Sequence, residues 1–142
     1  MLFVAEKGVV KRIARAIMWI VALFYAYGAL VHVMNMLSLT GFDWLNAPRK
    51  WQVLDIIYLV FDLIVAIGFL ARWKVSYAVF YLAASSQIVL YTAFRDWITN
   101  VPEEFALSPE QASYLNILVM FHCVTLILVT IALRVAHNHQ TA

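Results

Sequence analysis

Four long apolar stretches separated by short polar ones dominate the chain. They cover residues of about 16–39, 51–71, 75–94 and 112–133, and an α-helix needs ~20 such residues to cross the ~30 Å hydrocarbon core of a bilayer. Only Arg72, Trp73 and Lys74 separate the second stretch from the third, so these two helices must be antiparallel neighbours. The pattern predicts an all-α integral membrane protein, with one domain over residues 1–142 built as an antiparallel four-transmembrane-helix bundle.

Two further segments lie outside the predicted spans. Residues 2–15 place Lys7, Lys11 and Arg15 at helical i, i+4 spacing among apolar residues, which is typical of an amphipathic helix on a membrane surface. Residues 95–111 form the longest loop, which we expect on the outer side. The sequence Ser108-Pro109-Glu110-Gln111 is a capping box and predicts the start of the last helix, with Ser108 as the N-cap.

Composition agrees with a membrane protein and excludes several classes. Of the 142 residues, 65% are hydrophobic and 13% are charged, which is more apolar surface than a soluble domain of this size needs. The net charge of +2 gives no nucleic-acid signal. A single cysteine, Cys123, excludes a disulfide, a CxxC pair and a CxxCH haem attachment within these residues. Phosphate-loop, GxSxG, HExxH and dinucleotide motifs are absent.

The basic residues are distributed unevenly between the two sides of the predicted bundle. Loops rich in Lys and Arg stay in the cytoplasm, so the richer side is predicted to be cytoplasmic, and both termini lie on it. That side has Lys7, Lys11, Arg12, Arg15, Arg72, Lys74 and Arg134, whereas the other has Arg49, Lys50 and Arg95.

Polar side chains recur within the spans at steps of three and four residues, on the inward faces of their helices. Asp62 is the strongest constraint, because a carboxylate at the bilayer centre costs about 2.5–3.5 kcal/mol on insertion scales. Counted from the outer end of each span, Asp62 lies about eleven residues deep, His122 about ten, and Gln87 and His32 about seven, so at ~1.5 Å per residue the depths agree within roughly 6 Å. We predict one polar layer in the outer half of the bundle, which Asn35, Asp55, Tyr58 and Tyr91 extend outward.

Several kinds of chemistry suit this layer. Asp62, Asp55 and His122 have the groups of a proton relay, in which His32 is an alternative partner of Asp62. His32, His122, Gln87, Asn35 and Tyr91 are candidates for contacts with a quinone or another cofactor. His32 and His122 could instead be the axial ligands of one b-type haem.

Two other interpretations of the layer stay open. His32, Asp62 and His122 have the composition of a two-histidine, one-carboxylate metal site, but no local spacing motif supports it and we assign no metal ligands. The layer can also be purely structural, with its polar groups satisfying one another and setting the helix register.

The chain resembles the DoxX-like small membrane proteins. The similar features are Gly28-Ala-Leu-Val-His32 in the first span, the residues from Pro48 to Trp51 before the second, and Gly68 near the inner end of that span. The resemblance implies a four-helix bundle in the bacterial inner (plasma) membrane, acting as a small subunit or partner of an oxidoreductase that feeds electrons to quinone.

Together these features predict an accessory or anchoring subunit of an inner-membrane redox complex, rather than an enzyme by itself. Its polar layer would contact a quinone, a haem or a proton path, and its partners would be the lipid bilayer and other membrane subunits or a second copy of the chain. One alternative is a small proton-coupled transporter or channel using Asp62. Another is a purely structural partner of a larger membrane protein.

Overall fold

The computed structural model describes residues 2–141, with side chains for residues 8, 9 and 11–135. Over this range the chain is helical and contains no strand. The elements are α1 (Leu2–Met36), η1 (Trp44–Asn46), α2 (Arg49–Ala71), α3 (Lys74–Thr92), α4 (Arg95–Thr99), η2 (Glu103–Phe105) and α5 (Pro109–Thr141). In the described range, four of these helices contain stretches long and apolar enough to cross a bilayer: Lys11–Met36, Arg49–Ala71, Lys74–Thr92 and Pro109–Val135. The chain is therefore a multi-pass, all-α membrane protein, as its hydrophobic pattern predicts.

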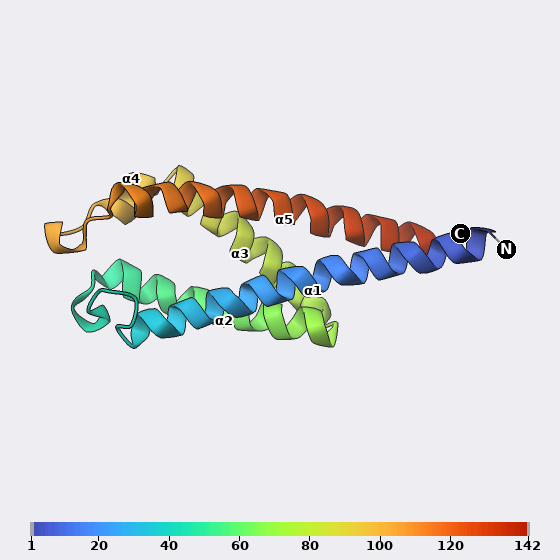
Figure 1. The fold of residues 1–142 in the computed structure, drawn as a ribbon, viewed down its shortest axis with the longest axis horizontal. Coiled ribbons are helices and arrows are strands. Elements are labelled where there is room, and N and C mark those ends of the chain that lie inside the picture. The colour runs from blue at the N-terminus through green and yellow to red at the C-terminus, as the bar shows by residue number, and fades with distance from the viewer. Residues whose placement is uncertain (1, 142) are drawn as a thin grey trace.

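The four long helices surround a common axis in the order α1, α2, α3, α5. Each packs against its two neighbours in this ring. The start of α1 lies beside the end of α5, at the opposite end of the molecule from α4 (Figure 1). The antiparallel bundle is thus confirmed. Below, the end near the termini is called the inner end and the end that carries α4 the outer end.

The first helix extends well before the first predicted span. Residues 2–15, expected as a separate amphipathic segment, continue into the span as one helix. No proline interrupts this stretch, and the one glycine, Gly8, costs only about 1 kcal/mol of helix propensity. The basic stretch therefore prolongs α1. The side chains of residues 2–7, including Lys7, lie outside the described residues.

The start of α5 has the capping box expected from the sequence. The Gln111 backbone N–H donates to the Ser108 hydroxyl at 3.3 Å, and the Ser108 N–H donates back to Gln111 Oε1 at 2.8 Å. These two bonds satisfy amides that the helix itself leaves unpaired. The prediction that Ser108 is the N-cap is confirmed.

Apolar side chains fill the inner half of the bundle. Phe80 lies fully buried on α3 among small residues of the same helix and side chains from the other three long helices. The members of this buried cluster are Val21, Ala22, Tyr25, Val65, Ala66, Phe69, Phe80, Ala83, Ala84 and Val129. The alanines let the helices approach closely, which favours van der Waals packing in a membrane. This apolar core leaves polar chemistry to the outer half.

The turn between α2 and α3 depends on a close approach at Gly68. A Cβ at this position would overlap with the Cβ of Ser76 and lie 2.8 Å from its hydroxyl. The Gly68 carbonyl also accepts a hydrogen bond from the Trp73 N–H at 2.8 Å, which closes the end of α2. Both contacts join the two helices at their tightest connection.

We expect Gly68→Ala to destabilise the bundle by about 1–3 kcal/mol, because the added methyl group overpacks this contact. Thermal unfolding of the purified chain in mild detergent measures the change. Gly8→Ala is the matched control, since nothing lies within 4 Å of a Cβ there. Equal stability of the two variants would contradict the close approach.

Candidate functional site

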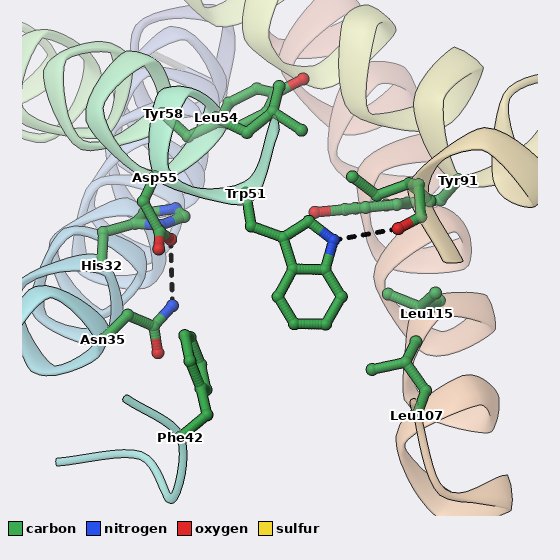
Figure 2. A pocket seen from close by; sticks show the side chains of 11 residues that line it. His32, Asn35, Phe42, Trp51, Leu54, Asp55, Tyr58, Tyr91, Leu107 and Leu115 are labelled. Atoms are coloured by element: carbon green, nitrogen blue, oxygen red, sulfur yellow. Dashed lines mark hydrogen bonds and ion pairs between the residues drawn. The ribbon is translucent and has the colours of Figure 1, made fainter. Parts of the chain in front are cut away.

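Asp55 is the centre of a hydrogen-bond network in the outer half of the bundle. Its Oδ1 accepts from His32 Nδ1 at 2.7 Å and from Asn35 Nδ2 at 3.0 Å, and its Oδ2 accepts from Trp44 Nε1 at 2.9 Å. Figure 2 shows Asp55 of α2 close to His32 and Asn35 of α1. Only 7% of Asp55 is exposed, so its carboxylate needs such donors to offset the loss of water. The network joins α1, α2 and the loop at Trp44.

His32 lies between two carboxylates. Its Nδ1 donates to Asp55, while its Nε2 lies 3.7 Å from Oδ2 of Asp62. Asp62 follows Asp55 by seven residues on the same helix, which is about 10 Å deeper at ~1.5 Å per residue. The two imidazole nitrogens therefore face different acids.

Asp62 fits the bundle because Gly28 faces it. A Cβ at Gly28 would overlap with Oδ2 of Asp62. The acid is only 4% exposed, so it is packed closely by its neighbours. Gly28 therefore provides the room for the deeper carboxylate.

A second polar pair, Gln87 and His122, joins α3 to α5. The Nε2–H of His122 donates to Gln87 Oε1 at 2.7 Å, which leaves Nδ1 with a lone pair that can accept a hydrogen bond. This Nδ1 and the hydroxyl of Tyr25 are buried atoms without a hydrogen-bond partner in the described part of the chain. Since buried polar groups are nearly always paired, these two atoms mark a place where the protein can bind another molecule.

These side chains line a central cavity of about 260 Å³ between the four long helices. All seven residues predicted from the sequence to form the site contribute to it. They are His32, Asn35, Asp55, Asp62, Gln87, Tyr91 and His122. The structure thus brings the predicted polar layer together around one space, while the function of the layer stays a prediction.

An outer pocket of about 210 Å³ adjoins the central cavity. The two share His32, Asp55 and Tyr91 among their lining residues. In the outer pocket, Tyr91 and Leu115 lie across from His32 and Asp55 (Figure 2). Asp55 therefore lines both spaces, whereas Asp62 lines only the deeper one.

The outer loop covers the outer pocket. Phe42, Trp51 and Phe105 contact one another edge to face, with ring centroids 5.9 to 6.5 Å apart. Trp51 Nε1 donates to the Ile98 carbonyl at 2.9 Å (Figure 2), and Lys50 donates to the Trp97 and Asn100 carbonyls. These bonds hold the loop against the start of α2.

The central cavity also reaches the side of the bundle, between α1 and α5. Tyr27 of α1 and Tyr114 of α5 line it, and they are 56% and 50% exposed. Closer to the inner end the two helices are joined by Phe24 and Phe121, which stack with ring centroids 3.5 Å apart. In a membrane the side of the bundle faces lipid, so a lipid-soluble molecule can approach the cavity from there.

Pairings within the layer differ in part from those considered from the sequence. The ion-pair partner of Asp62 in the described residues is His32, whereas His122 bonds Gln87. Asp55 also accepts a bond from Trp44 of the loop before α2. The site residues predicted from the sequence did not include Tyr25. This residue shares the polar face of the first span with Gly28, His32 and Asn35, and its spacing from them is the signal that could have identified it.

The residues do not fit the haem or metal alternatives. Both nitrogens of His32 face carboxylates and Nε2 of His122 bonds Gln87, so the two rings do not offer a pair of free Nε2 atoms to one iron. Within the described side chains, no group of three or more His, Cys, Asp or Glu residues is arranged to hold a metal ion. The set of His32, Asp62 and His122 is therefore not formed as a metal site.

Comparisons of the chain with protein-family models, curated proteins and solved structures give no match. The resemblance to DoxX-like proteins stays a prediction, and the proposals below depend on the geometry of the cavity.

Asp55→Ala should destabilise the chain by about 3 kcal/mol or more, because three partly buried donors lose their acceptor and bonds to charged groups contribute ~1.5–3 kcal/mol each. Unfolding in mild detergent measures the loss, and Trp44 fluorescence should shift to the red as its indole is released.

Asp43→Ala is the control for this substitution. Asp43 is an exposed acid of the loop that contains Trp44. Its carboxylate accepts from the Leu45 N–H and from Asn46 Nδ2. We expect it to cost about 1 kcal/mol as a cap. If both variants lost the same stability, Asp55 would not be the centre of the network.

Proposed function

We propose that the chain is an accessory subunit of a membrane redox complex and binds a quinone in the central cavity. The observation that carries this proposal is a pair of buried atoms without hydrogen-bond partners, the Tyr25 hydroxyl and His122 Nδ1, on two residues that line that cavity. The first can donate to a quinone carbonyl, and the second can accept from a quinol hydroxyl.

Size and access support the same class of ligand. A cavity of ~150 Å³ takes up benzene, so about 260 Å³ can hold a substituted six-membered ring. The lining combines apolar side chains such as Leu115 and Leu118 with a few polar groups, which is the usual composition of a small-molecule site. The opening beside Tyr27 and Tyr114 allows an isoprenoid tail to stay in lipid while the ring enters.

The series of side chains Asp55, His32 and Asp62 gives this site a route for protons. Reduction of a quinone to a quinol takes two electrons and two protons. In the proposal the electrons come from a partner oxidoreductase, and the protons enter through the outer pocket at Asp55. They pass through the two nitrogens of His32 to Asp62, which lines the cavity.

A site open from one side is favoured over a channel. Inward of the cavity, the fully buried Val65, Phe80 and Val129 fill the bundle, so apolar packing separates Asp62 from the inner end. A purely structural role explains the Asp55 network and the Gln87 and His122 pair. It leaves the Tyr25 hydroxyl and His122 Nδ1 without partners.

Substitution of the two unpartnered groups should weaken quinone binding. We expect Tyr25→Phe and His122→Leu each to lower the affinity for a short-chain quinone about 5- to 10-fold, since one hydrogen bond contributes ~1 kcal/mol. Binding is measured by titrating the purified chain in nanodiscs with the quinone and following tryptophan quenching.

The control is Tyr81→Phe. It removes a tyrosine hydroxyl that bonds Thr130 at 2.7 Å and does not line the cavity. Its affinity should equal that of the wild type. Unchanged affinity in Tyr25→Phe and His122→Leu, or no saturable binding to the wild type, would refute the quinone site.

The proposed location is the bacterial inner membrane with both termini in the cytoplasm, because seven of the ten basic residues lie towards the inner end. A green fluorescent protein fused after Ala142 should then fluoresce in a bacterial host. Alkaline phosphatase fused after Glu104 should be active, because that loop is expected outside. The reverse pair of results would show the opposite orientation.

A further inference from the structure

A separate cavity lies at the inner end of the bundle. It has a volume of about 310 Å³ and is bounded by residues of α1, α2, α3 and α5 and of the turn after α2. It shares no lining residue with the central cavity or the outer pocket. Arg15 of α1 and Arg72 of the turn, both exposed, are among its lining residues. We call it the arginine cavity.

No acid neutralises these two arginines in the described part of the chain. The ion pairs found there involve only His32 with Asp55 and Asp62. The acids whose side chains are described all follow the end of α1 in the sequence. They belong to the outer loops, to α2 at Asp55 and Asp62, or to the start of α5. Two arginines from different segments can bind one anion together, because their planar donor sets suit phosphate oxygens.

The backbone at Arg72 points independently to a role for its side chain. Arg72 has φ 60° and ψ 39°, the left-handed conformation that ends α2. Glycine is preferred in this C-cap conformation because it has no Cβ. The fold itself thus has no need of an arginine here, and residues in such conformations often mark ligand sites.

The remaining wall has the character of a lipid site. Phe69, Leu70 and Leu133 provide apolar surface, and Trp19 and Tyr77 are side chains that favour the level of lipid headgroups. Trp19 is 52% exposed and Leu70 44% exposed, so the cavity is continuous with the lipid-facing side of the bundle. Arg72 directly follows the last residue of α2, which places the charge where an apolar span ends.

We propose that the arginine cavity binds the phosphate headgroup of an anionic phospholipid. Arg15 and Arg72 donate to its phosphate oxygens, and the acyl chains lie along Trp19 and Leu70. This site is independent of the quinone proposal, since it shares no residue with the central cavity.

The test uses the full chain, purified in a neutral detergent, with thermal unfolding followed as lipid is added. Phosphatidylglycerol should raise the unfolding temperature more than phosphatidylcholine. Arg15→Gln with Arg72→Gln should weaken the effect of phosphatidylglycerol at least tenfold in lipid concentration. Arg12→Gln with Lys74→Gln is the matched control, because it removes the same charge at the same end from residues that do not line the cavity. It should keep most of the effect.

Arg72→Gly provides a second variant that removes the guanidinium and retains the backbone conformation, since glycine suits the left-handed position. We expect it to fold and to lose the preference for phosphatidylglycerol. Equal losses in the two double variants would overturn the proposal in favour of diffuse charge attraction. Equal stabilisation by inorganic phosphate would show a site for a free anion, and equal effects of the two lipids would show that there is no headgroup site.

Discussion

Two carboxylates buried within the span of an apolar helix constrain the outer half of this bundle. Neither Asp55 nor Asp62 can obtain water from a bilayer, so each needs compensation from its own chain. Asp55 obtains it from three donors, of which His32 and Asn35 come from α1 and Trp44 from the following loop. Asp62 obtains it from His32, with room provided by Gly28. The two requirements determine how α1 is rotated against α2, because the glycine and the imidazole must face the acids together.

Polar and apolar residues divide the bundle into two halves with different properties. The inner half is filled mainly by apolar residues such as Val65 and Phe80, which pack the four helices against one another. The outer half contains the central cavity, two imidazoles and two acids. Interhelical hydrogen bonds in membranes contribute on average only ~0.6 kcal/mol, so stability alone gives little reason for so many polar groups. Their arrangement around one cavity is the basis of the proposal that it binds a ligand.

The lipid bilayer has two roles in this account. At the side of the bundle, between α1 and α5, it is the phase from which the proposed quinone would approach the central cavity. At the inner end it supplies the anionic headgroup proposed for Arg15 and Arg72. The chain is almost entirely membrane-embedded helix with short connections. Lipid therefore faces most of its side surface, and both proposed sites open towards it.

The sequence alone determined the number of spans, their antiparallel arrangement, the capping box at Ser108 and the depth of the polar layer. These features depend on the length and periodicity of local stretches and on a constant rise per residue. It also identified seven residues that share one cavity, because each lay on the polar face of its own helix. Only the tertiary structure decided that Asp62 meets His32 and that His122 bonds Gln87, since both imidazoles lie at a suitable depth. It likewise brought Trp44 to Asp55 and placed Arg15 in one cavity with Arg72. The depth of a residue in the membrane follows from counting along its own helix. Its hydrogen-bond partner depends on how the helices are rotated and ordered around the bundle, and side-chain packing between helices sets both.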